Sequence, residues 1–346
     1  MLTDSTRMAA GPGRSGRETK GHLVDRFGRR IEYVRLSVTD RCNLRCFYCM
    51  PKGFKSFEPQ DQRLQFDEIE RIIRAFAELG VHRVRLTGGE PLVRKDLPVL
   101  SARLAALPGI EDLSLSTNAT LLRRHAQDLY AAGIRRINVS LDTLDVRRYA
   151  DITGGGDLHC VLDGLQAARD AGFCPIKINM LALKDTPREE YLRIVEYCMQ
   201  HDFTLRFIET MPMGLPGQQG RQQYLSLKRV KHWLQQDYDL VPGLMTGGGP
   251  ARYFRVSGTD FQMGFITPIS QHFCATCNRV RIAVDGTLYL CLGHNDKVEL
   301  RPLLRAGISL AEIKQVISAA VWSKPERHEF ERKPGQVVRL MSMTGG

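Results

Sequence analysis

Three cysteines lie within eight residues of the 346-residue chain, in the segment TDRCNLRCFYCMP, at Cys42, Cys46 and Cys49. A disulfide needs two thiols and a structural zinc ion usually takes four ligands, so a set of three leaves a metal centre one ligand short. Thiolates also hold iron-sulfur clusters. A four-iron cluster bound here by one cysteine per iron would keep one iron open to a substrate. The spacing CxxxCxxC also differs from the paired CxxC pattern of structural zinc sites.

A second set of three cysteines lies near the other end of the chain, at Cys274, Cys277 and Cys291. One ligand of a metal centre is again missing. A zinc ion completed by His272 or His294 is the alternative interpretation of this set. Two arginines follow Cys277 with one residue between them, so that on a strand they would share one face with the thiols close by in the sequence.

Composition limits what these thiols can do. The chain is 43% hydrophobic and 25% charged, which is typical of a globular protein with a sizeable core. No apolar run reaches the length of a membrane span, and residues 1–20 lack a continuous hydrophobic segment, so we expect a cytoplasmic protein with no membrane partner and a disordered N-terminal tail. In a reducing compartment the nine cysteines do not predict a disulfide framework. The scattered Cys160, Cys174 and Cys198 are expected to be small buried residues.

The charge balance indicates an anionic partner. Lys and Arg together number 49 against 38 for Asp and Glu, a net charge of +11. A phosphorylated small molecule, a nucleic acid or a membrane surface would each fit this charge. No block of basic residues with interleaved aromatic residues stands out, so we expect no nucleic-acid partner.

The cysteines and basic residues must be positioned by regular elements of the fold. Short β-branched runs alternate along the chain with amphipathic stretches. Strands are predicted at 33–39, 84–88, 113–117, 137–142, 176–183 and 205–210. Helices are predicted between them, for example at 67–80, 121–133 and 188–200. Six βα units in series predict a parallel α/β sheet, either a complete or partial barrel or an open doubly wound sheet.

The pattern changes after about residue 240. A Gly-rich break at 241–250 is followed by short strands, a hairpin signal at Asp285-Gly286 and one helix near 308–322. We therefore divide the chain into a tail at 1–20, a barrel domain at 21–240 and a smaller α+β module at 241–346.

Polar or small residues end each predicted barrel strand, and chemistry in βα barrels is carried out at these carboxyl ends. The ends carry Cys42 to Cys49, Gly88-Gly89-Glu90, Ser116-Thr117-Asn118, Ser140 with Asp142, Lys177 with Asn179, and Glu209-Thr210-Met211. Two arginines, Arg35 and Arg85, lie inside strands that are expected to be buried. An unpaired buried charge is costly, so a functional role explains them better than a surface role.

The first cysteine motif, with Tyr48 before its last cysteine, resembles the signature of the radical S-adenosylmethionine superfamily, and Gly88-Gly89-Glu90-Pro91 resembles that superfamily's methionine-binding strand end. The resemblance implies a partial (βα)6 barrel. The segments RLTGGEPL, NVSLDTLD, RFIETMPMG, CATCNRVRI and the terminal Gly345-Gly346 together resemble the GTP 3′,8-cyclase family of molybdenum cofactor biosynthesis, from about residue 22 onward.

The resemblance implies two [4Fe-4S] clusters, one on each set of cysteines, and a role for individual residues. The residues implied to contact S-adenosylmethionine are Tyr48, Gly89, Ser140 and Met211. The residues implied to contact GTP are Arg35, Arg85, Ser116, Lys177, Arg279, Val280 and Arg281. Of these, Arg35, Arg279 and Arg281 are also implied in catalysis, together with Gly345 and Gly346.

The implied reaction joins C3′ of the GTP ribose to C8 of guanine, giving (8S)-3′,8-cyclo-7,8-dihydroguanosine 5′-triphosphate. The resemblance also implies a homodimer, an electron donor such as flavodoxin or ferredoxin, and cyclic pyranopterin monophosphate synthase as acceptor of the product. Two alternatives remain at this point. One is another radical enzyme with an auxiliary cluster, such as a peptide-modifying maturase, and the other is a zinc-stapled RNA-binding module.

Overall fold

The computed structural model describes residues 22–50, 53–214, 221–244, 249–330, 337 and 339–345. The predicted tail at 1–20 lies outside the described residues. The strands are β1 (Tyr33–Thr39), β2 (Arg83–Gly88), β3 (Asp112–Thr117), β4 (Arg136–Ser140), β5 (Ile176–Leu181), β6 (Thr204–Ile208), β7 (Leu240–Pro242), β8 (Arg252–Val256), β9 (Gln262–Ile266), β10 (Arg279–Ile282), β11 (Thr287–Tyr289) and β12 (Lys297–Glu299).

Helices follow most of the strands. They are α1 (Phe66–Glu78), α2 (Leu97–Ala105), α3 (Leu122–Ala131), α4 (Val146–Thr153), α5 (Leu158–Asp170), α6 (Arg188–Gln200), α8 (Leu227–Leu234), α9 (Leu300–Arg305), α10 (Leu310–Trp322) and α11 (Met341–Thr344). None of the helices in the described ranges is long and apolar enough to cross a membrane.

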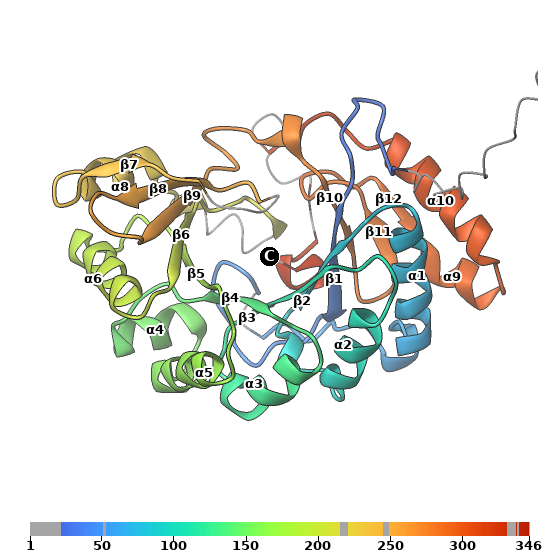
Figure 1. Ribbon diagram of the computed structural model, residues 1–346, viewed down its shortest axis with the longest axis horizontal. Helices are drawn as coiled ribbons and strands as arrows, with labels where there is room; N and C mark the ends of the chain where they lie inside the picture. The colour runs from blue at the N-terminus through green and yellow to red at the C-terminus, as the bar shows by residue number, and fades with distance from the viewer. Residues whose placement is uncertain are drawn as a thin grey trace, which may run out of the picture.

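All strands belong to one curved sheet with the order β12-β11-β10-β1-β2-β3-β4-β5-β6-β9-β8-β7. The eight strands from β10 to β9 in this order run parallel, and the two strands at each end are antiparallel. Helices α1 to α6 cover the convex side (Figure 1). The predicted parallel α/β fold with six βα units is confirmed, and the sheet stays open between β12 and β7.

Alternation along the parallel strands separates an apolar face from a polar one. In β1 the apolar Val34, Leu36 and Val38 are fully or almost fully buried. Their counterparts in the neighbouring strands, such as Val84, Leu115 and Ile178, belong to the same hydrophobic core as the covering helices. Since side chains alternate along a strand, the intervening residues face the concave side. The helices thus cover the apolar face and leave the polar residues pointing into the curve.

The C-terminal strands extend the sheet at both edges. β9 pairs in parallel with β6, and β10 pairs in parallel with β1. The hairpin predicted at Asp285-Gly286 is confirmed, because β10 and β11 are antiparallel and Gly286 has a positive φ of 85°. The two edges of the six-strand core are therefore completed by residues that come late in the chain.

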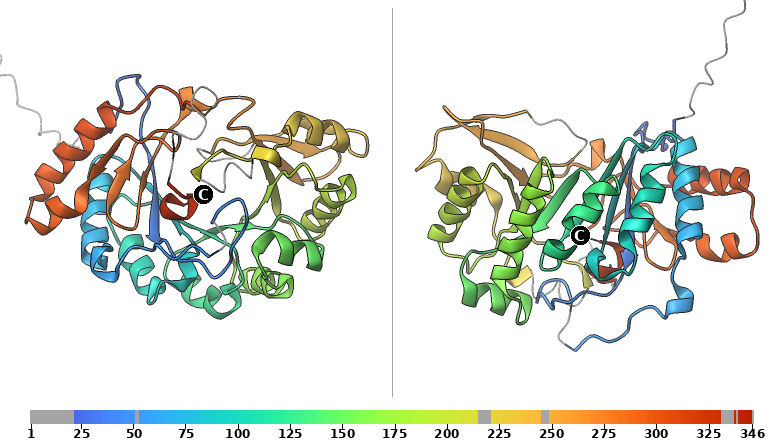
Figure 2. Two further views of the ribbon diagram at one scale, coloured as in Figure 1. Left: turned by 180° about the vertical axis from the view of Figure 1, so that it is seen from behind. Right: turned by 60° about the horizontal axis from the view of Figure 1, so that its bottom comes forward.

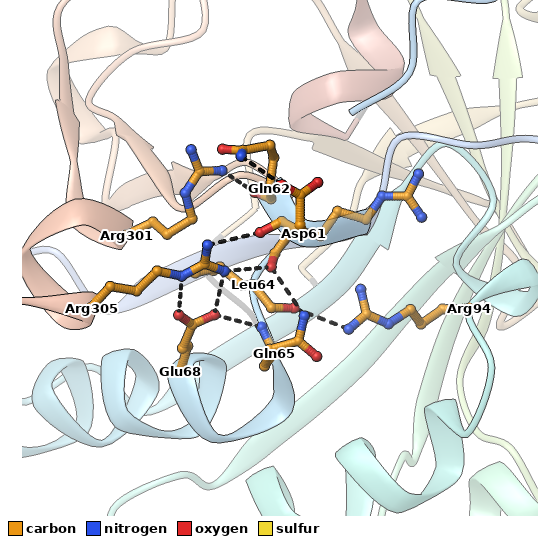
Figure 3. A network of polar contacts seen from close by, with 9 residues as sticks. Asp61, Gln62, Leu64, Gln65, Glu68, Arg94, Arg301 and Arg305 are labelled. Carbon is orange, nitrogen blue, oxygen red and sulfur yellow. Dashed lines mark hydrogen bonds and ion pairs between the residues drawn. The ribbon is translucent and has the colours of Figure 1, made fainter. Parts of the chain in front are cut away.

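A polar network fastens α9 to the segment that follows the first cysteine loop (Figure 3). The Arg305 guanidinium donates to the Asp61 carbonyl at 2.8 Å and pairs with the Glu68 carboxylate at 2.8 Å. Arg301 donates to the Gln62 carbonyl, and Arg94 donates to the Leu64 carbonyl at 3.0 Å. Main-chain carbonyls accept most of these bonds, so the network holds the backbone of the segment in place.

The short helix α11 lies inside the curve of the sheet, and the views from behind and from below agree on this position (Figures 1 and 2). It contacts β1 and β2. Among the scattered cysteines only Cys198 is buried, so the expectation was wrong for Cys160 and Cys174, which are exposed. Cys160 falls outside the buried stripe of α5, and Cys174 lies in the loop before β5.

Candidate active site

One cavity of about 210 Å³ lies on the concave side of the sheet. It brings together all the residues that the resemblance assigns to GTP and all three cysteines of the second set, with Met211 at its wall. The strand register explains this convergence, since Arg35 lies beside Arg85 on one side and beside Arg281 on the other. Val280 is the exception in orientation, because its side chain belongs to the apolar core.

The lining carries many positive charges and few negative ones. The cavity arginines are Arg35, Arg83, Arg85, Arg136, Arg206, Arg279 and Arg281. Only Arg136 among them forms an ion pair with a described carboxylate, that of Asp112. Buried charges of one sign need a counter-charge. The cavity is therefore built to receive an anion.

Arg35 is the most constrained of these groups. Its side chain is 7% exposed, and its buried Nε and Nη2 atoms have no hydrogen-bond partner among the described residues. Burial and the nearby charge of Arg281 hold the pKa of Arg35 well below its ordinary value. A guanidinium with unused donors inside a cavity offers them to a ligand.

Two further cations face the same space from β5 and β6. Burial, followed by the charges of Arg206, Arg136 and Arg85, lowers the pKa of Lys177 to about 7. Burial also lowers the pKa of Arg206 to about 10, and this guanidinium donates to the Asn138 side chain at 2.5 Å. Both shifts have the same physical origin, which is positive charge crowded in a site that excludes water.

The second set of cysteines lies at one end of the cavity, next to a buried lysine. Lys324 is 2% exposed and lines the cavity together with Cys274, Cys277 and Cys291. Burial raises the pKa values of Cys274 and Cys291. Burial opposes ionisation of Cys277 as well, but the charges of Lys324 and Arg279 more than offset it and lower the pKa of this thiol. Cationic surroundings of this kind favour thiolates, the form that binds metal.

The first set of cysteines lies on the loop after β1. A turn in which the Cys49 and Met50 amides donate to the Cys46 carbonyl, at 3.0 and 3.1 Å, folds the loop back on itself. Burial raises the pKa of Cys42 to about 11 and that of Cys49 to about 12. The thiols influence one another's ionisation, since the charge of Cys49 contributes to the raised pKa of Cys46 after burial itself. The three thiols are thus neighbours whose ionisation is coupled.

The end of β2 packs directly against this loop. The Gly89 amide donates to the Thr39 carbonyl at 2.8 Å, and a Cβ on Gly89 would lie 2.3 Å from the Arg41 carbonyl oxygen. Only glycine permits this approach. The buried Glu90 carboxylate then accepts bonds from the Thr117 hydroxyl and the Asn118 amide, both at 2.7 Å. The motif therefore ties the cysteine loop to the ends of β2 and β3.

The remaining residues assigned to S-adenosylmethionine lie on three different segments of the chain. Tyr48 donates to the Asp142 carboxylate at 2.6 Å and so links the loop to the end of β4. Ser140 is exposed at that same strand end. Met211 lines the main cavity and packs against the small cluster that includes Phe330. Tyr48 thus lies within the first cysteine loop and Gly89 packs against it, whereas Met211 lies at the main cavity.

The C-terminal residues reach the same region. Gly345 has a φ of 72°, and a Cβ on it would lie 2.1 Å from the Thr87 Cγ2 atom. Arg281 donates to the carbonyls of Thr344, at 3.3 Å, and of Gly345. Thr344 is completely buried. Gly346 lies outside the described residues.

Several lining residues were not found from the sequence. They are Tyr33, Arg83, Asp112, Arg136, Arg206, Tyr253, Phe273, Lys324 and His328. Four of them stand at the beginning of a strand, whereas the search considered strand carboxyl ends. The alternation of charged residues with apolar ones, as in Arg83-Val84-Arg85, was a signal that could have identified the strand residues. The sequence around Lys324 carries no comparable signal.

Comparisons with known proteins agree with this architecture. Residues 36–198 match the radical SAM superfamily, and residues 203–330 match the family described as Molybdenum Cofactor Synthesis C. The chain is 46% identical to GTP 3′,8-cyclase 2 of Pseudomonas aeruginosa over 94% of its own length and 98% of that protein. It is 44% identical to GTP 3′,8-cyclase of Rhizobium leguminosarum over 94% of each chain.

Solved structures show the same fold at much lower identity. The structure of Streptococcus suis SuiB bound to S-adenosylmethionine matches with a TM-score of 0.59 at 16% identity, over 90% of this chain and 77% of that one. At this identity the likeness concerns the fold alone. The identity to the curated relatives covers nearly the whole of both chains, and the cysteine loop and strand ends described above lie within it. The chain therefore belongs to the GTP 3′,8-cyclase family of radical S-adenosylmethionine enzymes.

Proposed function

We propose that this protein catalyses the 3′,8-cyclisation of GTP. The main observation in support is one cavity lined both by three thiols and by a face of the sheet with several guanidinium groups, some of whose buried nitrogens have no hydrogen-bond partner among the described residues. A nucleoside triphosphate matches both ends of this space, since it carries a purine base and several negative charges. Membership of the family, together with the match to Molybdenum Cofactor Synthesis C, supports a role in making the molybdenum cofactor.

The first set of cysteines is proposed to hold a [4Fe-4S] cluster that binds S-adenosylmethionine. Three half-buried neighbouring thiols on one loop are a suitable donor set for a four-iron cluster with one open iron. When bound, the cluster supplies the electron that splits S-adenosylmethionine into methionine and a 5′-deoxyadenosyl radical. The chain's own part is to hold the cosubstrate: Gly89 leaves room beside the loop, and Tyr48 is oriented by Asp142.

The second set is proposed to hold another [4Fe-4S] cluster, next to the guanine base. Zinc is the competing occupant, and it requires ligands that converge on one point about 2.3 Å from each sulfur. A four-iron cluster takes each cysteine on a different iron and needs no such convergence. The lowered pKa of Cys277 further supports binding as thiolate.

The cationic face is proposed to hold the triphosphate and orient the ribose. Guanidinium forks bind phosphate oxygens in pairs, and the ammonium of Lys177 adds a point charge. The deoxyadenosyl radical removes hydrogen from C3′, the C3′ radical adds to C8 of guanine, and one electron and one proton complete the product. The main catalytic contribution expected of the protein is to hold C3′ of the ribose close to both the 5′ carbon of the deoxyadenosyl radical and C8 of guanine. Cytoplasmic location and reduction by flavodoxin or ferredoxin are part of the same proposal.

The reaction can be tested directly. Protein reconstituted anaerobically with iron and sulfide is expected to convert GTP to the cyclised product in the presence of S-adenosylmethionine and a reductant, and to leave ATP unchanged. Mass spectrometry of the nucleotide and iron counting provide the measurements. Cleavage of S-adenosylmethionine without consumption of GTP would favour another radical enzyme. Stoichiometric zinc at the second set under anaerobic conditions would contradict the two-cluster assignment.

Substitution of Arg35 is expected to move stability and substrate binding in opposite directions. Arg35→Met removes a buried charge that lacks a described partner, so the substrate-free protein should melt at a higher temperature. The same change should weaken GTP binding about tenfold or more, because a charge-assisted hydrogen bond contributes about 1.5–3 kcal/mol. Arg74→Met on α1, whose side chain is half exposed, is the control. Loss of stability with unchanged GTP affinity would make Arg35 a structural residue.

Lys177 predicts a pH dependence of GTP binding. Its pKa of about 7 in the free protein would rise beside a triphosphate, so binding takes up a proton above that pH and none well below it. The affinity of the wild-type protein should therefore fall as the pH rises from about 6 to about 9, by up to about tenfold per pH unit above the free pKa. Lys177→Arg keeps its charge, so it should show only the dependence due to GTP itself. Equal slopes for both proteins would contradict the prediction.

A further inference from the structure

Both loops that carry the second set of cysteines are held to one short segment, Lys324 to Glu326, by buried cations. The first contact comes from the N-terminal part of the chain. Arg29 is 8% exposed, and its Nη1 atom donates to the Cys274 carbonyl at 2.8 Å. The same guanidinium donates to the carbonyls of Glu326 and Pro325, each at 2.7 Å. Arg29 thus joins the Cys274 loop to the segment that follows α10.

Arg29 is itself held in place by Asp25. The Asp25 carboxylate is almost completely buried and accepts from the Arg29 Nε atom at 2.6 Å. It also accepts from the Arg29 amide at 3.0 Å and the Phe27 amide at 2.9 Å, inside a turn closed by the bridge between Val24 and Arg30. Since four of the five guanidinium donors have fixed directions toward three carbonyls and one carboxylate, a lysine could not reproduce the contact.

Lys324 completes the connection from the same segment. Its ammonium group donates to the carbonyl of Leu290, the residue before Cys291. Lysine is rarely buried to this degree without a partner, and Lys324 forms no ion pair with another described residue. Its charge instead acts on the three thiols of the second set. The segment thus contacts the Cys274 loop through Arg29 and the Cys291 strand end through Lys324.

We propose that Arg29 and Lys324 are positioning residues that fix the separation of Cys274 and Cys277 from Cys291. This inference rests on the proposed function, in which these cysteines hold the second cluster. The cysteines stand on two different loops, and on these loops the cations bind the carbonyls of Cys274 itself and of Leu290, the neighbour of Cys291. Loss of either contact leaves both loops in place on the sheet but frees their spacing.

The test uses full-length protein in which Cys42, Cys46 and Cys49 are all replaced by alanine, so that any bound cluster belongs to the second set. Into this background go Arg29→Gln, Arg29→Lys and Lys324→Met, with Arg26→Gln, an exposed neighbour in the same turn, as the control. Arg29→Gln and Lys324→Met are expected to lose cluster iron to a chelator about 10–100-fold faster than the parent, as for other residues that orient metal ligands. They should also change the electron paramagnetic resonance spectrum of the reduced cluster. Arg29→Lys should restore iron retention only in part.

A second measurement does not depend on iron. In the metal-free proteins, hydrogen exchange should quicken at residues 272–278 in Arg29→Gln and at residues 289–293 in Lys324→Met, while the core strands β2 to β5 stay protected. Iron retention, spectrum and exchange equal to those of the parent would overturn the positioning role. A parent that binds no cluster at all would refute the proposed second cluster, and the exchange comparison would still decide the role of the two cations.

Discussion

Replacement of Cys46 by alanine is expected to abolish both cleavage of S-adenosylmethionine and formation of cyclised GTP. Cys46 accepts the two turn hydrogen bonds through its carbonyl, and its half-buried thiol lies beside those of Cys42 and Cys49. Alanine keeps the turn but removes one of three ligands, so the proposed cluster can no longer be held with a single open iron. Quantification of 5′-deoxyadenosine and of cyclised nucleotide after anaerobic reconstitution measures both losses.

Two further substitutions serve as controls for this loss. Cys160→Ala removes an exposed thiol on α5 and should leave both products unchanged. Cys274→Ala should abolish the cyclised nucleotide but retain slow cleavage of S-adenosylmethionine, because the first loop is intact. Cleavage by the Cys46→Ala protein at more than a trace rate would show that S-adenosylmethionine is not bound where we propose.

Substitution of Gly345 by alanine is expected to lower the rate of GTP cyclisation by about a hundredfold or more, with far less effect on cluster content. The new Cβ would overlap the Thr87 side chain, and Gly345 has a backbone conformation that alanine rarely adopts. The C-terminal end must then withdraw from Arg281, which faces the proposed substrate. Displacement of a positioned group by about 1 Å can reduce catalysis by this factor. Single-turnover rates with both products measured will separate cyclisation from cleavage.

The double substitution Gly345→Ala with Thr87→Ala tests the steric explanation. It removes the Thr87 Cγ2 and Oγ1 atoms, the two nearest contacts, and leaves only the Cβ contact at 2.8 Å. Part of the activity should return. Full cyclase activity in the single Gly345→Ala protein, or in a protein with a tag fused directly to Gly346, would mean that the C-terminal residues take no part in the reaction.

The strands and helices of the first 210 residues could be predicted because the sheet is covered on one face and polar on the other. A strand such as Ile176–Leu181 alternates buried and half-buried positions. Such positions favour β-branched and other apolar residues, and this local pattern can be recognised in the sequence. Helix α6 occupies the predicted range of 188–200 because a stripe of apolar residues recurs at helical spacing. The conserved chemistry of strand ends in βα folds then indicated where a site should lie.

Long-range pairing could not be predicted in the same way. Nothing near Arg279 indicates that it pairs with Tyr33, and the contact between Arg29 and Cys274 joins residues 245 positions apart. The cavity residues at the strand beginnings were not predicted for a related reason. The cavity lining includes Arg83 and Arg136 at strand beginnings, and only the assembled sheet shows that these residues face the same space as the strand ends.

The way the C-terminal strands complete both edges of the sheet has a consequence for the protein's synthesis. Leu36 of β1 pairs with Ile282 of β10, and Phe207 of β6 pairs with Phe265 of β9. Contacts between such distant residues form late, and a strand edge without its partner readily pairs with other chains. A nascent chain that has emerged only as far as β6 therefore has two edge strands, β1 and β6, whose backbone groups lack a pairing strand. Both edges find their partners only after β9 and β10 have been translated.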